Sequence, residues 1–176
     1  TRPDYLLPSL SFLLEFTNIL AKVVVAPYHQ IFQQLLDPSS ISAQNSNGIN
    51  VFVVRLEDFV RDYAEPKGIV EHVEKTALDL VESLSQFKNR TGSPAMFALL
   101  PCSPRISGEL KLKLNDITAS LENRLRSIPG LVIISTEDLS KASFNTDSGY
   151  DGLSDELAHV PFCEASFAAL ALAIAR

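Results

Sequence analysis

Short apolar runs alternate with amphipathic helical patterns along this chain, and no other sequence feature constrains its fold as strongly. We predict strands at four runs, residues 22–26, 50–54, 96–100 and 131–135. Between these runs, apolar residues recur at i, i+3 and i+4, which is typical of helices. Strand–helix alternation favours a parallel sheet, because right-handed crossovers place helices on both of its faces. The predicted fold is therefore an α/β, three-layer α/β/α sandwich.

The helical pattern is most regular over residues 107–128, where Ser107 can cap a helix that Pro129-Gly130 ends. Five further helices are predicted, at residues 6–19, 28–36, 55–63, 69–88 and 164–175, with a short helical turn at 136–138. Two polar stretches, residues 39–48 and 143–154, are predicted to be irregular loops because they are rich in Asn, Ser, Asp and Gly.

The amino-acid composition excludes several classes of function. The 176 residues are 46% hydrophobic, enough for one core, so we expect a single domain over residues 1–176. A net charge of −6 without a basic cluster argues against nucleic acid and anionic membrane surfaces as partners. Cys102 and Cys163 form neither a disulfide framework nor a zinc spacing, so no metal is expected and a cytoplasmic location is favoured. No apolar run approaches the ~20 residues of a membrane span.

Polar residues follow each predicted strand. Because the carboxyl ends of parallel strands meet at one edge, these residues should share a rim, where we expect any chemistry to lie. They are Tyr28-His29-Gln30, Arg55 with Glu57 and Asp58, Cys102-Ser103, and Thr136-Glu137-Asp138.

Two of these groups allow a structural and a functional interpretation. Tyr28, His29 and Gln30 could hold an anionic group, such as a phosphopantetheine phosphate, at a helix amino terminus. Alternatively, Tyr28 packs and Gln30 caps the helix. Arg55, Glu57 and Asp58 are candidates for ligand binding at the rim or, as we prefer, for an ion-pair network that also includes Arg61.

Three segments of the chain resemble a known family. They run from Ala26 to Ser40, from Gly48 to Asp58, and from His159 to Phe162. In this order they resemble the amino-terminal domain of the FkbH-like proteins of polyketide and nonribosomal peptide pathways. That resemblance implies a flavodoxin-like, SGNH-hydrolase-like fold, followed in a longer protein by a haloacid-dehalogenase-type domain that makes glyceryl thioesters on an acyl carrier protein. This chain is then a fragment of a multidomain protein.

The sequence departs from active SGNH hydrolases at several points. Family members usually have a strand before the first helix, and SGNH hydrolases carry their nucleophilic serine at its end; here only Thr1 to Tyr5 precede that helix. No Gly-Asp-Ser occurs, and Arg55-Leu56-Glu57-Asp58 stands where the resemblance would place Gly-x-Asn-Asp. The aspartate-containing phosphate-transfer motif of the dehalogenase domain is also absent from the sequence. The resemblance therefore implies that this chain does not transfer glyceryl groups by itself.

Asp155 and His159 resemble the Asp-x-x-His of SGNH enzymes, with one additional residue between them. A carboxylate that orients a histidine is the base half of a hydrolytic triad. Cys102, or a serine such as Ser103, is the candidate nucleophile. The structural alternatives are a histidine at a loop end and a buried, unreactive cysteine.

Two functions follow from these observations. The preferred one is a catalytically degenerate accessory domain that binds a neighbouring catalytic domain or an acyl carrier protein. No cofactor is expected within the domain itself. If it binds a carrier protein, it would contact the phosphopantetheine arm of that carrier. The alternative is a hydrolase or acyltransferase that acts on an ester or thioester through His159 and Asp155.

Overall fold

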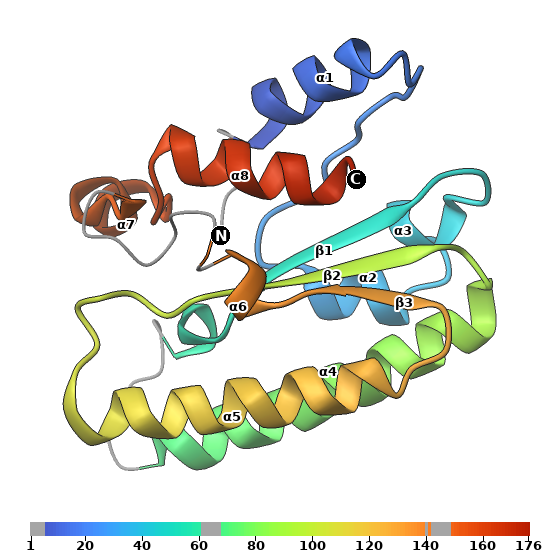
Figure 1. The fold of residues 1–176 in the computed structure, drawn as a ribbon. Coiled ribbons are helices and arrows are strands. Elements are labelled where there is room, and N and C mark those ends of the chain that lie inside the picture. Colours follow the sequence, from blue (N-terminus) through green and yellow to red (C-terminus); the bar gives the residue numbers. More distant parts are fainter. Residues whose placement is uncertain (1–5, 61–67, 140, 142–148) are drawn as a thin grey trace.

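The predicted α/β architecture is confirmed by the computed structural model, which describes residues 6–60, 68–139, 141 and 149–176. The described sheet has three strands, β1 (Asn50–Arg55), β2 (Ala95–Leu100) and β3 (Leu131–Ile134), in the order β1-β2-β3. Both pairings are parallel, and Met96 of β2 lies opposite Val51 of β1 and Val132 of β3. Helices cover both faces of this sheet (Figure 1).

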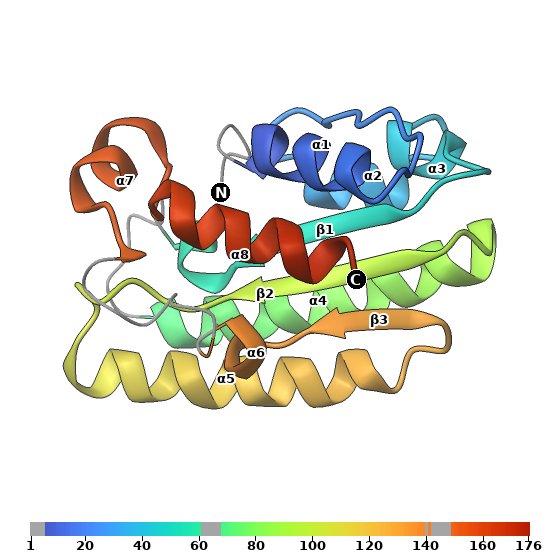
Figure 2. The ribbon, with the colours of Figure 1, turned by 45° about the horizontal axis from the view of Figure 1, so that its top comes forward.

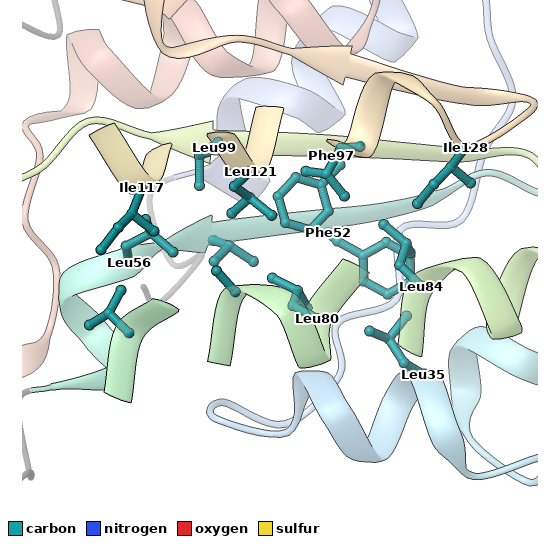
Figure 3. Close-up of a cluster of buried hydrophobic side chains, with 14 of the residues drawn as sticks. Leu35, Phe52, Leu56, Leu80, Leu84, Phe97, Leu99, Ile117, Leu121 and Ile128 are labelled. Carbon is teal, nitrogen blue, oxygen red and sulfur yellow. The ribbon is translucent and has the colours of Figure 1, made fainter. Parts of the chain in front are cut away.

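One face of the sheet carries the larger of two cores. Helices α4 (Ile69–Thr91), α5 (Gly108–Arg126) and α2 (Ile31–Leu36) pack against it. Their apolar stripes meet Phe52 and Phe97 of the sheet, and Figure 3 shows side chains such as Leu80 and Leu121 between helices and strands. We call this set of residues the large core. Helix α4 ends at Gly92, whose φ of 63° suits glycine and whose N–H donates to the carbonyl of Lys88.

The opposite face carries the small core. Helices α1 (Leu6–Phe16) and α8 (Glu164–Ile174) pack against each other and over this face (Figure 2). Its buried residues come from α1, α8, the strands, the short helix that follows β3 and the segment before α8; they are Leu6, Leu10, Ala98, Leu100, Ile134, Leu139, Val160, Phe162, Phe167, Leu170 and Ala171. The helices on the two faces and the sheet between them form three layers, as the strand–helix alternation predicted.

The prediction of a strand at residues 22–26 was wrong. This segment is not a strand, and no described residue pairs with its backbone. A β-branched run favours an extended backbone, but a strand also needs a neighbour for its N–H and C=O groups. The run belongs to no helix or strand and is half-exposed, and the helix after it begins at Ile31, later than the predicted residue 28.

Short helices account for the other differences. Helix α3 (Ile41–Gln44) interrupts the predicted loop at 39–48, because the Ser40 hydroxyl accepts a hydrogen bond from the Ala43 N–H and caps it. The helix expected at 55–63 is a 3₁₀ turn, η1 (Leu56–Phe59), and residues 61–63 lie outside the described part. Helix α6 (Thr136–Leu139) matches the predicted turn. Helix α7 (Gly152–Ala158) was not predicted.

Candidate functional site

A buried ion cluster lies at the carboxyl end of β1, centred on Arg55, the last residue of that strand. The Arg55 side chain is fully buried. Its Nε and Nη2 donate to Asp58 Oδ1 at 2.9 and 2.6 Å, and its Nη1 lies 3.0 Å from Glu57 Oε1. The ion pairs expected from Arg55 to Glu57 and Asp58 are therefore present, while Arg61 lies outside the described residues.

The third carboxylate of this cluster comes from a distant part of the chain. Asp155, in helix α7, accepts from Arg55 Nη2 on Oδ1 at 2.9 Å and from Nη1 on Oδ2 at 3.1 Å. This bidentate geometry is the strongest form of an arginine–carboxylate pair. Tyr150 also donates its hydroxyl to Asp155 Oδ2 at 2.9 Å. We call Arg55, Glu57, Asp58, Asp155 and Tyr150 the Arg55 cluster.

The loop after β2 closes the Arg55 cluster on another side. The backbone N–H of Ser103 donates to Glu57 Oε2, and the Ser103 hydroxyl accepts from the N–H of Arg105 at 3.1 Å. Ser103 is itself buried. Ser103 thus lies at the rim as predicted: its N–H binds the Arg55 cluster, while its hydroxyl accepts from the loop backbone.

Charges within the cluster shift its pKa values in different directions. Burial acts to lower the pKa of Arg55, but the hydrogen bond with Asp155 and the charges of Asp58 and Glu57 outweigh it and raise that pKa. Burial raises the pKa of Glu57 despite the charge of Arg55. For Asp58, burial acts in the same direction, but nearby charge and hydrogen bonds, with the charge of Arg55 the largest of them, together outweigh it and lower the pKa. The guanidinium thus stays charged and holds Asp58 ionised.

His159 lies at the carboxyl end of α7, where it takes a left-handed conformation with φ of 57°. Its N–H donates to the carbonyl of Asp155 at 3.1 Å, and its ring stacks on that of Tyr28 with centroids 5.7 Å apart. Tyr28 and His159 therefore meet at the rim, although they are far apart in sequence. The Asp155 carboxylate, in contrast, is held on both oxygens by Arg55.

The turn at residues 28–30 is shaped by its backbone as much as by its side chains. His29 has φ of 62°, and its ring packs edge-on against Tyr28 at 4.4 Å. Gln30 is the N-cap residue of α2 but makes no capping hydrogen bond with its side chain. The six-residue helix α2 that follows offers a short dipole.

Cys102 is half-buried and packs against the large core. Burial, with a smaller effect from the charge of Glu57, raises the pKa of its thiol to about 12. Because the thiolate is the nucleophilic form, this environment makes Cys102 a poor nucleophile at neutral pH.

The rim residues after β3 belong to local helix-start contacts. Thr136 donates both its N–H and its hydroxyl to Glu122 Oε1, at 2.8 and 2.9 Å. Asp138 accepts from the Ser135 hydroxyl at 2.6 Å, and Glu137 forms an exposed ion pair with Lys141. These residues share the predicted edge and make no described hydrogen bond to the Arg55 cluster.

The sequence did not predict that Tyr150 belongs to the site, or that Asp155 lies in a helix, α7. The signal for α7 is Asp151, whose carboxylate accepts from the Ser154 N–H at 3.0 Å in the manner of an N-cap. Nothing in the sequence indicates that Asp155 reaches Arg55, one hundred residues away.

Within the described residues, no group of three or more His, Cys, Asp and Glu side chains has a metal-binding arrangement. None of the helices described is both long and apolar enough to cross a membrane. Two shallow hollows lie away from the rim, one between α4 and α5 and one between α2 and α4.

Comparison with known proteins gives one structural relationship. No family model and no curated protein matches this chain. A matching solved structure is that of the N-terminal part of the protein BF1531 from Bacteroides fragilis, which contains a phosphatase domain and was crystallised with Mg. It superposes with a TM-score of 0.78 at 13% identity, over 97% of this chain and 47% of that one. This chain therefore shares its fold with part of that solved chain and spans about half of the solved chain's length.

Proposed function

We propose that this chain is an accessory, catalytically degenerate SGNH-like domain of a polyketide or nonribosomal peptide biosynthetic protein. The observation that carries the proposal is the engagement of Asp155: both of its carboxylate oxygens accept from Arg55, and one also accepts from Tyr150. A catalytic carboxylate must orient and stabilise a histidine, whereas this one neutralises a buried guanidinium.

The candidate nucleophiles point in the same direction. The pKa of Cys102 is raised to about 12, and Ser103 is buried with its hydroxyl engaged by the loop backbone. A hydrolase of this class needs a nucleophile within hydrogen-bond reach of an activating base. Neither residue has the environment of an activated nucleophile.

The structural match supports a role beside another domain. BF1531 contains a phosphatase domain, and this chain corresponds to about half of the solved part of that protein. The present sequence has no Asp-x-Asp-x-Thr, the phosphate-transfer motif expected of the dehalogenase-type domain. We therefore assign this chain to the non-phosphatase half of such an arrangement, with a neighbouring catalytic domain of the same cytoplasmic assembly as its partner.

A carrier protein is the less favoured partner. The chain has a net charge of −6, and acyl carrier proteins are themselves usually acidic, so long-range electrostatics would oppose the encounter. Docking of a carrier would then depend on local apolar contacts and on the turn at residues 28–30, which would meet the phosphopantetheine arm.

The alternative, an ester or thioester hydrolase or acyltransferase, draws on one observation. Stacking against Tyr28 brings the His159 ring to the rim, beside the turn at residues 28–30. In this alternative, His159 is the base, and the Asp155 carboxylate would have to leave Arg55 or serve both groups.

Hydrolysis assays distinguish the two functions. The purified chain, His159→Ala and Cys102→Ala are compared on a chromogenic short-chain ester and on an acyl-pantetheine thioester, with His72→Ala of helix α4 as the matched histidine control. We expect no turnover above buffer in any of them. Turnover that is lost in His159→Ala but retained in His72→Ala, with unchanged circular dichroism, would make the domain an enzyme and refute the proposal.

A further inference from the structure

Glu57 is held by fewer hydrogen bonds from Arg55 than the other two carboxylates of the Arg55 cluster. Asp58 and Asp155 each accept two such bonds. Glu57 instead has an ion-pair contact of 3.0 Å from Oε1 to Arg55 Nη1, and its Oε2 accepts from the backbone N–H of Ser103. A proton that enters the cluster is therefore expected to bind Glu57.

The charges around Glu57 favour that proton. Among the described side chains of the cluster, one guanidinium faces three buried carboxylates, so full ionisation leaves an excess of negative charge. Burial and the charges of Asp155 and Asp58 raise the pKa of Glu57 above its ordinary value of 4.5, against the charge of Arg55 and the hydrogen bond from Ser103. The charged or titratable groups that face Glu57 come from β1, η1, α7 and the loop after β2; they are Arg55, Asp58, Asp155 and Cys102.

Residues 101–106, which we call the rim loop, separate Glu57 from solvent on the side of β2. Among the backbone N–H groups of this loop, the one of Ser103 has a described partner in another element, the Glu57 carboxylate. The N–H groups of Arg105 and Ile106 both donate to Ser103 itself, at 3.1 Å. Movement of the rim loop therefore breaks one backbone hydrogen bond to the rest of the described chain and admits water to Glu57.

Proton binding and closure of the rim loop are therefore linked. Water stabilises a carboxylate, so Glu57 binds its proton more tightly under the closed loop than under an open one. Below about pH 4.5, the closed and the open loop both hold the proton, and the preference for closure is complete. That preference is lost as pH rises through the higher pKa of the closed state. Loss of the proton thus shifts the population toward the open loop.

We propose that Glu57 is a proton-operated latch: the rim loop is closed over the Arg55 cluster while Glu57 holds a proton, and it opens when that proton leaves. Opening exposes the backbone of Ser103. It also frees the start of α7, because the Arg105 guanidinium lies against Gly152, where a Cβ atom would come within 2.6 Å of Nη2. The latch responds to pH whether or not the domain has catalytic activity.

Amide hydrogen exchange of the 176-residue chain between pH 5 and pH 8 tests the latch. After correction for the intrinsic pH dependence of exchange, we expect the protection of the Ser103 amide to fall by at least about threefold as pH rises. In Glu57→Gln, the side-chain amide oxygen still accepts from Ser103 but does not titrate, so the protection should be independent of pH. The Phe97 amide in β2 reports unfolding of the sheet and should be better protected than Ser103 at every pH.

Glu122→Gln is the matched control. Glu122 also accepts from a backbone N–H at the rim, that of Thr136 at 2.8 Å, but it lies outside the Arg55 cluster, so the pH dependence at Ser103 should remain. Protection of Ser103 that is constant or rises with pH in the wild type would overturn the proposal, even where Glu57→Gln does not fold. Wild-type pH dependence in Glu57→Gln, or equal exchange of Ser103 and Phe97, would overturn it as well.

Discussion

Substitution of Arg55 by methionine should destabilise the domain strongly. The guanidinium is fully buried and is surrounded by three carboxylates, each with at least one contact of 3.0 Å or less. Breaking a buried ion pair by removing one partner costs about 3–5 kcal/mol, because it leaves an uncompensated buried charge. For a protein of this size, each kcal/mol lowers Tm by about 2–4 °C. We therefore expect Arg55→Met to lower the free energy of unfolding by about 3–5 kcal/mol and Tm by roughly 6–20 °C.

Urea unfolding followed by circular dichroism measures this loss, with Arg105→Met as the matched control. Arg105 pairs with Glu156 at 3.5 Å, and both side chains are more than half exposed, so this substitution should cost no more than about 1 kcal/mol. Equal effects of the two substitutions, or a cost of Arg55→Met below about 1 kcal/mol, would show that the buried cluster contributes no more than a surface pair.

The difference between wild type and Arg55→Met should also depend on pH. Arg55 lowers the pKa of Asp58 in the folded state, so this stabilisation is complete above the pKa of the unfolded state, about 3.9, and is lost as pH falls through the folded value. Without Arg55 this stabilisation is smaller, because the largest of the contributions that lower the pKa of Asp58 has been removed. The gap in unfolding free energy should therefore be wide near pH 7 and narrow toward pH 3, and a constant gap would contradict the assigned electrostatic cause.

Two further predictions concern the core and the cysteines. Leu80→Ala should lower the free energy of unfolding by about 2–5 kcal/mol, because Leu80 is fully buried in the large core. Leu78→Ala, on the exposed side of the same helix, should lower it far less. Urea unfolding of both variants measures the difference. Iodoacetamide at pH 8 should alkylate Cys163 at least about tenfold faster than Cys102, and mass spectrometry measures both rates. Burial raises the pKa of the Cys102 thiol. For Cys163, hydrogen bonds from Ser166 and Ala165 outweigh burial and lower the pKa of the thiol. Faster alkylation of Cys102 would contradict its assigned environment.

The helices that cover the large core were predictable from the sequence, whereas one strand was not. Helices α4 and α5 bury one continuous stripe each, and the spacing of residues such as Leu114, Ile117 and Leu121 carries that information locally. The three observed strands are apolar runs with buried neighbours. Residues 22–26 have the same local signal, but hydrogen-bonded pairing is a property of two segments, which the pattern of one segment does not contain.

In the site, too, contacts between sequence neighbours were predictable, whereas contacts between distant segments were not. Contacts of Arg55 with Glu57 and Asp58 were anticipated because all three lie within four residues after the strand predicted at 50–54. Asp155 was identified as a candidate from its spacing to His159, but its actual partner depends on how α7 docks at the rim. Tyr150 lies in a stretch without periodicity, so its hydrogen bond to Asp155 follows only from the three-dimensional arrangement.

The division into two cores has a consequence for the order in which this chain folds. The segments that build most of the large core, β1, η1, α4, β2, α5 and β3, follow one another along the chain, so each new element can pack on one that has just formed. Closing the small core instead requires α1 and α8, which come from opposite ends of the described chain, and loop closure over such a distance is entropically expensive. On a ribosome, the large core can therefore assemble during synthesis, while α1 must wait for α8 to emerge before its buried face finds a partner.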